Sequence, residues 1–104
     1  MMPPDSRSDT AWVALEHALA AAVGATLSPA GQRELLSEFV AVGQGHDPER
    51  RQLLWGYKHV GTRRYFFLDA AGDAYLYDET GGRYIAVPVR DAIDGVRDGP
   101  SLLG

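Results

Sequence analysis

Apolar residues recur at three- and four-residue spacings over positions 12–23, which is the period of one face of a helix. Either Ser8 or Asp9 is the predicted N-cap, because each side chain can accept from the free amides of the first turn. Gly24 is typical of a helix end. The predicted buried face consists of Trp12, Leu15, Leu19, Ala22 and Val23.

A second helix is predicted to begin after Ser28 and to end at Gly43. Ser28 is the expected cap, and Pro29 suits the first helical position, where its missing amide hydrogen costs nothing. The short link between the two helices predicts an antiparallel helical hairpin. The buried face of this second helix is predicted to comprise Leu35, Leu36, Phe39, Val40 and Val42.

The middle of the chain is harder to assign. Residues 44–50 are predicted to form a turn or loop, which either opens a brief third helix capped by Asp47 or leads straight into a strand. The following residues 52–60 are apolar enough for either element. Gly56 and the aromatic residues around it favour a strand.

From Gly61 onward the apolar period is that of strands. Residues 63–69, 73–78 and 84–89 are separated by glycine-containing links, which supply the positive φ that hairpin turns need. Pro88 cannot donate to a ladder, so it is expected at an edge or at a strand end. The last 15 residues have room for one short helix, with Ile93 and Val96 facing inward.

The two expected hairpin turns set a register, and the register sorts the side chains into two faces. If Asp69 and Asp73 flank the first turn, Phe67 pairs with Tyr75, Tyr65 with Tyr77 and Phe66 with Leu76. A second turn centred on residues 80–81 pairs Tyr84 with Tyr77 and Ile85 with Leu76. One face is then aliphatic and suits packing on helices: Phe66, Leu68, Leu76, Ile85 and Val87. The other is aromatic: Tyr65, Phe67, Tyr75, Tyr77 and Tyr84.

The pattern predicts a single α+β domain over residues 9–104, preceded by a disordered tail at residues 1–8 that has nothing to bury. An N-terminal helical hairpin packs on a three- or four-stranded antiparallel meander sheet. The aromatic face is explained either by cross-strand pairing within the sheet or by recognition, since tyrosine gives an interface a large rigid contact with a polar tip. A homodimer interface would combine the two explanations, because the aromatic face would then pack against a second copy of the chain.

Composition narrows the function classes. The chain has no cysteine, which excludes a disulfide, a thiolate nucleophile and cysteine-ligated metals and fits a reducing cytoplasm. Its formal net charge is −4 and its basic residues are dispersed, so a nucleic-acid partner is disfavoured. The longest apolar run is far shorter than the roughly 20 residues of a membrane span.

No motif predicts catalysis, a metal site or a cofactor. His17, His46 and His59 lack the spacing of a zinc site on one helix or strand. The acids of residues 69–79 are expected to be turn residues, because Asp and Gly favour hairpin turns for backbone reasons alone. The Arg63–Arg64 pair beside Tyr65 suits stacking on RNA bases, yet the acidic balance favours solvated arginines at a strand end.

Two segments resemble the SUKH superfamily of bacterial immunity and interaction proteins. Residues 14–39 are similar to its opening, a helix containing a glutamate followed by a short glycine link and a proline-capped helix. The matching positions are Leu27, Pro29, Arg33, Leu35, Leu36 and Phe39, with Ser28 between the usually adjacent leucine and proline. Residues 66–78 are similar to its strand–turn–strand, matched at Gly72, Asp73, Tyr75 and Asp78. The resemblance implies a protein that binds and blocks a toxin, often a nuclease or deaminase, through a cleft on the sheet.

The functional hypothesis is therefore a non-enzymatic protein-binding module, with an immunity protein for a basic toxin as its specific form. Two alternatives stay open: a small-molecule or nucleotide-sensing domain with the aromatics lining a cleft, and a structural homodimer subunit. The residues expected to bind the partner are the aromatic anchors Tyr65, Phe67, Tyr75, Tyr77 and Tyr84, with Asp73, Asp78 and Glu79 as the charged rim.

Overall fold

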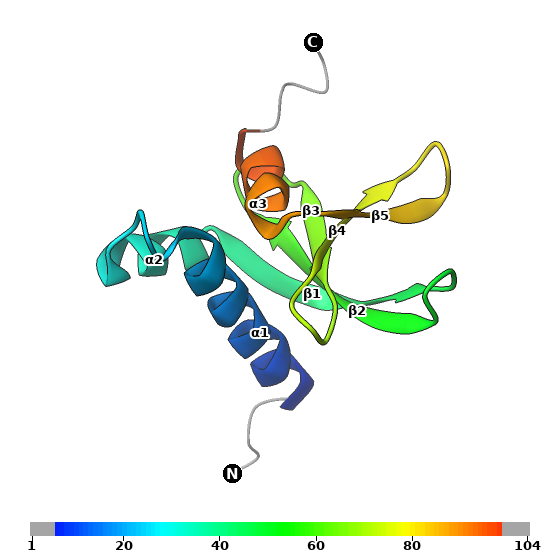
Figure 1. The fold of residues 1–104 in the computed structure, drawn as a ribbon, viewed down its shortest axis with the longest axis horizontal. Coiled ribbons are helices and arrows are strands. Elements are labelled where there is room, and N and C mark those ends of the chain that lie inside the picture. Colours follow the sequence, from blue (N-terminus) through cyan, green and yellow to red (C-terminus); the bar gives the residue numbers. More distant parts are fainter. Residues whose placement is uncertain (1–5, 99–104) are drawn as a thin grey trace.

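The computed structural model describes residues 6–98 and has the predicted α+β architecture (Figure 1). Five antiparallel strands form one sheet in the order β1-β2-β3-β4-β5, so each strand pairs with its neighbour in the chain. The strands are β1 (Phe39–Asp47), β2 (Gln52–His59), β3 (Tyr65–Leu68), β4 (Ala74–Asp78) and β5 (Arg83–Val87), and the helices are α1 (Ser6–Val23), α2 (Pro29–Leu36) and α3 (Val89–Asp98).

Helix α1 buries the stripe that the spacing predicts. Leu15, Leu19 and Val23 are buried, and Trp12 and Ala22 pack partly against the same core. The helix begins at Ser6, ahead of the predicted cap at Ser8 or Asp9. Residues 6–8 of the predicted tail therefore belong to α1, and residues 1–5 lie outside the described part of the chain.

The predicted second helix is correct at its start and wrong at its end. Ser28 Oγ accepts from the amide of Gly31 at 3.1 Å, and Pro29 is the first helical residue. The helix ends at Leu36, and residues 39–47 form strand β1 instead. Of the expected apolar face, Leu35 in α2 and Phe39 in β1 are buried, whereas Val40 and Val42 in β1 are exposed. Gly43 lies at a register shift in the β1–β2 ladder with a φ of 138°, which only glycine adopts readily.

The remaining elements follow the sequence pattern. Residues 52–59 form a strand, β2, and the predicted C-terminal helix is α3, with Ile93 and Val96 buried. Pro88 lies between β5 and α3, at a strand end as expected. The predicted hairpin register holds at Phe67–Tyr75 and at Tyr77–Tyr84.

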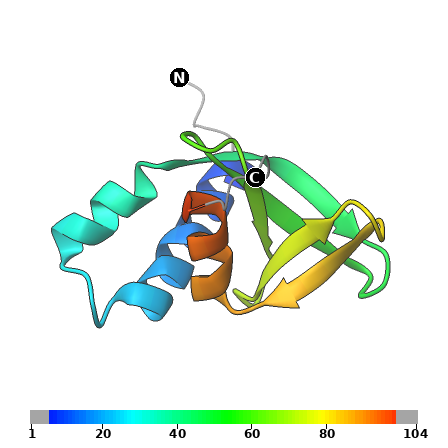
Figure 2. The same cartoon turned by 90° about the horizontal axis from the view of Figure 1, so that it is seen from above.

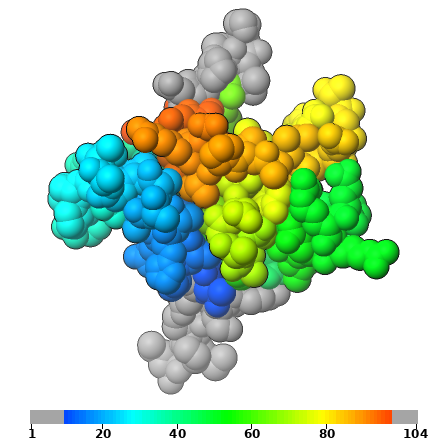
Figure 3. Space-filling view, in the orientation of Figure 1, coloured from blue at the N-terminus to red at the C-terminus, as the bar shows by residue number. Residues whose placement is uncertain are grey.

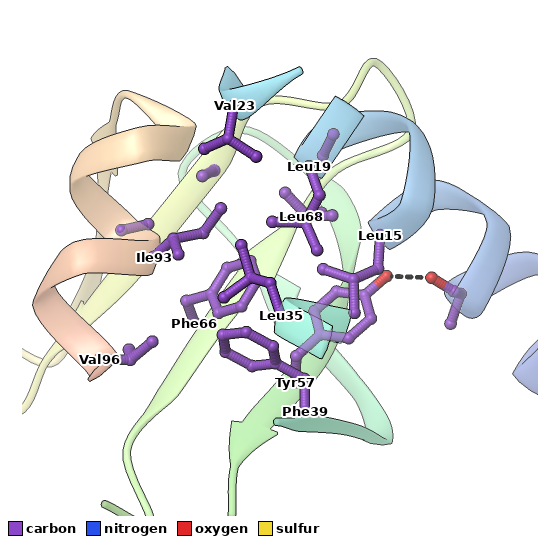
Figure 4. Packing of buried hydrophobic residues seen from close by; sticks show 14 residues of the cluster. Leu15, Leu19, Val23, Leu35, Phe39, Tyr57, Phe66, Leu68, Ile93 and Val96 are labelled. Atoms are coloured by element: carbon purple, nitrogen blue, oxygen red, sulfur yellow. Dashed lines mark hydrogen bonds between the residues drawn. The ribbon is translucent and has the colours of Figure 1, made fainter. Parts of the chain in front are cut away.

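The main core lies between the helices and one face of the sheet (Figure 4). Helix α3 returns after β5 to pack beside α1, as the view from above shows (Figure 2). Phe66 is central to this core: its ring stacks on Tyr57 at 5.2 Å and meets Phe39 edge-on at 5.5 Å. The Tyr57 hydroxyl donates to the carbonyl of Ala11 in α1, so the one polar atom of this ring has a partner.

Candidate functional site

The face of the sheet turned away from the helices is also partly closed. Leu54 and Tyr75 are buried, although neither belongs to the core cluster that contains the buried residues of the helices. The sheet curves, so that the β1–β2 and β4–β5 hairpins approach each other while their tips project as separate lobes (Figure 3).

Glycines in β1 and β2 make room for the rings. A Cβ atom at Gly45 would lie 2.4 Å from the Tyr84 hydroxyl, and one at Gly56 would lie 3.1 Å from the ring of Phe67. Tyr84 in turn meets Phe67 edge-on at 5.0 Å and Tyr77 at 4.9 Å between ring centres. These contacts hold three of the five predicted anchors in one continuous aromatic cluster.

Tyr75, by contrast, belongs to the interior. It is only 5% exposed, and its hydroxyl donates to Asp69 Oδ2 at 2.7 Å and accepts from Gln52 Nε2 at 3.1 Å. The guanidinium of Arg50 lies 5.0 Å from the ring centre. Burial, reinforced by the bond to Asp69, raises the pKa of the Tyr75 hydroxyl. Tyr75 therefore has a structural position in the interior of the protein and is not an exposed anchor.

Arg50 links the two hairpins. Its Nη1 atom lies 2.8 Å from Asp47 Oδ2 and donates at 3.3 Å to the main-chain carbonyl of Tyr84 in β5. Asp47 is 1% exposed. Burial by itself raises the pKa of Asp47, but the bonds from Arg50 outweigh it and bring the pKa below its ordinary value. The sequence offered no signal for this contact, because it joins residues 34 positions apart.

The predicted acidic rim divides into turn residues and one cleft residue. Asp69 accepts from the amides of Ala71 and Asp73 at 2.9 Å each, and its own amide donates to the Asp73 carbonyl, so the first hairpin turn forms as expected. Asp78 Oδ1 likewise accepts from Thr80 N across the second turn. Asp73 is exposed at the first turn and does not line the cleft described next.

A cleft of about 990 Å³ opens beside the aromatic cluster. Of the predicted site residues it brings together Tyr65, Phe67, Tyr77, Tyr84 and Glu79, and it excludes Tyr75, Asp73 and Asp78. Tyr65 is 46% exposed and Tyr77 is 47% exposed, so both rings are open to a ligand. The residues that the prediction omitted are His46, Pro48, Arg63, Arg64, Leu76, Gly82, Gly95 and Val96.

The cleft lies where the sheet splits. Strand β3 pairs with β4 only at Phe67–Tyr75 and Leu68–Ala74, although both strands continue beyond these pairs. The expected pairs Tyr65–Tyr77 and Phe66–Leu76 are therefore not formed. Because of this gap, the cleft is lined both by Tyr77 from the aromatic face and by Leu76 and Val96 from the helical side.

A second group of polar side chains, outside the cleft, connects the His59 end of β2 to α3. His59 Nδ1 accepts from the amide of Thr62, so Nε2 carries the proton and donates to Glu38 at 2.8 Å. Arg97 of α3 also donates to Glu38, at 2.9 Å. These bonds, that of Arg97 foremost, lower the pKa of Glu38 despite its partial burial. The Thr62 hydroxyl also donates to the main-chain carbonyl of Val96 in α3, which adds a further bond between the strand end and this helix.

Among residues 6–98, no group of three or more histidine and acidic side chains is placed to hold a metal ion. No helix of this part of the chain has both the length and the apolar character to span a bilayer. No family model, curated protein or solved structure matches the chain. The resemblance to the SUKH superfamily thus rests on its sequence motifs alone.

Proposed function

We propose that this chain is a non-enzymatic protein-binding module that binds its partner in the cleft between the two hairpins. The observation that carries the proposal is the state of Tyr65 and Tyr77, two large rings nearly half exposed at the wall of a cleft. Tyrosine is enriched at binding hot spots, where a few residues carry most of the binding energy.

The chemistry of the cleft suits recognition. Burial, with smaller contributions from Tyr77 and Asp47, raises the pKa of the Tyr84 hydroxyl, so this group stays protonated at neutral pH and is a poor base or nucleophile. It keeps its capacity to donate a hydrogen bond. The lining otherwise combines aromatic, aliphatic, proline and glycine residues with His46 and the charged Arg63, Arg64 and Glu79.

The specific form that we propose is a toxin-neutralising immunity protein, in keeping with the SUKH-like motifs. A formal net charge of −4 favours a partner with a basic surface, because charge complementarity speeds association and improves specificity. Inside the cleft the balance is reversed, since two arginines accompany one glutamate. A basic partner is thus expected to present an apolar or acidic segment to the cleft itself.

The direct test is to identify the partner by affinity capture on the full chain and then to titrate the purified partner against variants. Tyr77→Ala is expected to raise the Kd at least about 30-fold, the scale of a hot-spot residue. Val13→Ala is the control, because Val13 is equally exposed but lies on α1, away from the cleft. Equal affinity for both variants would refute the cleft as the binding site.

A small planar anion is the second candidate ligand, favoured by one observation: Arg63 and Arg64 lie in the same cleft as four aromatic rings. Stacking and charge then act on one ligand. Thermal-shift measurements with a panel of nucleotides test this candidate, and a shift abolished by Arg63→Gln would support it. Light scattering tests the third candidate, a homodimer, which a monomeric mass would remove.

A further inference from the structure

The split in the sheet leaves strand edges facing the cleft. The amide of His59 donates to the Arg64 carbonyl at 2.8 Å, and hydrogen-bonded pairs alternate along an antiparallel ladder. Arg64, Phe66 and Leu68 therefore turn their main-chain groups toward β2. The intervening residues, Tyr65 and Phe67, turn theirs toward β4. Phe67 finds its partner in Tyr75, whereas Tyr65 lies beyond the last pair of the ladder.

The same alternation applies to β4. The amide of Gly82 donates to the Asp78 carbonyl at 2.7 Å, which turns Asp78, Leu76 and Ala74 toward β5. Tyr77 then directs its amide and carbonyl toward β3. Among the described residues, no ladder pair joins Tyr65 to Tyr77. Two donors and two acceptors of the main chain thus face each other across the cleft.

We infer that the cleft receives an extended segment of the partner, which adds to the sheet by pairing with the main chain of Tyr65 or Tyr77. This inference rests on the proposed function and specifies how the partner binds to the cleft. An extended peptide satisfies free strand edges through its own alternating amides and carbonyls, and its side chains enter pockets on the two faces.

The residues that line the cleft predict which types of side chain the partner segment carries. Alternate residues of a strand point to opposite faces. One set meets Leu76 on the helical side, and the other meets the rings of Phe67 and Tyr84. Both sets are therefore expected to be apolar. At the end of the cleft nearest Arg63, which is exposed, an acidic residue is favoured by charge.

The test begins with the free protein. Amide hydrogen exchange followed by NMR is expected to show faster exchange at Tyr65 and Tyr77 than at Phe67 and Tyr75, the paired residues of the same two strands. A linear random heptapeptide library displayed on phage is then selected against the full-length protein. The most enriched peptide is synthesised in unmodified form and with each amide methylated in turn.

The expected result has two parts. The peptide slows exchange at the Tyr65 or Tyr77 amide at least 10-fold, and N-methylation weakens binding at least 10-fold at alternate peptide residues only. If Tyr77→Ala abolishes binding but neither effect appears, the proposed function stands and the strand-addition mode is wrong. If Tyr77→Ala leaves peptide binding unchanged, or no enriched peptide depends on it, both proposals fail. Protection of these amides in a dimer without peptide would place a second copy in the cleft and overturn the inference.

Discussion

The tyrosines show how one residue type acquires different roles from its surroundings. Tyr57 fills the core, Tyr75 is held by polar partners, and Tyr65 and Tyr77 are open at the cleft. The alternation of the strands correctly placed Tyr75 and Tyr77 on one face. The alternation could not show that Tyr75 is buried and Tyr77 exposed, because Tyr75 is covered by Gln52 and Arg50 of the β1–β2 hairpin, which are distant in the sequence.

This distinction predicts a difference in stability. Tyr75→Phe is expected to lower the free energy of unfolding by about 1–2 kcal/mol, because it leaves the buried Asp69 without its hydroxyl donor. Tyr77→Phe is the matched control and is expected to change stability by less than about 0.5 kcal/mol, since Tyr77 is 47% exposed. Urea denaturation measures both. Equal losses would show that the two hydroxyls are in similar environments.

Glu38 gives the protein a predicted pH dependence. Its pKa is lowered in the folded state relative to the ordinary value of 4.5, chiefly by Arg97 and then by His59. A lowered pKa means that the carboxylate stabilises the fold above pH 4.5, and that this contribution disappears as the pH falls through the folded value. The difference in unfolding free energy between wild type and Glu38→Gln should be about 1 kcal/mol at pH 7 and should shrink toward pH 3.

A double variant supplies the control for this effect. With Arg97→Met already present, Glu38→Gln is expected to have a smaller effect at pH 7, because the largest cause of the pKa shift is gone. Denaturation curves at pH 3, 5 and 7 check both statements. A stability difference that grows as the pH falls would contradict the assigned bonds.

At the scale of elements, the sequence predicted the start of α2 and the turns that join β3, β4 and β5 correctly, because their signals are local, whereas α1 begins ahead of its predicted cap. Ser28 caps α2 through its own side chain, and Asp69 shapes its turn through neighbouring amides. The apolar run at residues 35–42 fits a helix or a strand equally. Gly45 has no room for a Cβ atom because the Tyr84 hydroxyl lies against it, and this contact between distant residues has no local sequence signal.

Two glycines within helices allow a prediction about α2 and α3. A Cβ at Gly31 would make ordinary contacts of 3.5 Å, and one at Gly95 would meet nothing within 4 Å. Gly31→Ala and Gly95→Ala should each raise the free energy of unfolding by up to about 1 kcal/mol, since alanine is the better helix former. Gly95→Leu should in addition weaken cleft binding, because Gly95 lines the cleft and Gly31 does not. Unchanged affinity of Gly95→Leu would exclude α3 from the binding site.

At the scale of the whole molecule, the cleft exists because the two hairpins belong to one sheet yet separate at β3 and β4. The sequence predicted the β4–β5 hairpin but not the β1–β2 hairpin, because residues 39–43 were expected to continue the second helix. The approach of the two hairpins was not predicted either, since the contacts that produce it are long-range. His46 and Pro48 enter the cleft only through the curvature of the sheet. Four of the five predicted anchors nevertheless line the cleft, because strand alternation survives any curvature.

Substitution of Arg50 tests whether this residue holds the β1–β2 and β4–β5 hairpins together. Arg50→Met is expected to lower the melting temperature and to speed amide exchange in β5, because the buried Asp47 loses its cation and the Tyr84 carbonyl loses a donor. Arg51→Met changes the neighbouring exposed arginine and is expected to do neither. Thermal denaturation together with NMR exchange measures both effects. Identical behaviour of the two variants would mean that Arg50 does not join the hairpins.

The most direct test of the central claim is a titration of the isotope-labelled full chain with its purified partner, followed by amide NMR shifts. Binding in the cleft predicts the largest changes at Tyr65, Tyr77, Gly82 and Gly95, which line the cleft from β3, β4, the β4–β5 turn and α3. The exposed surface of α1 around Val13 should stay unchanged. Changes confined to α1 and α2, with the four cleft amides unaffected, would contradict the account.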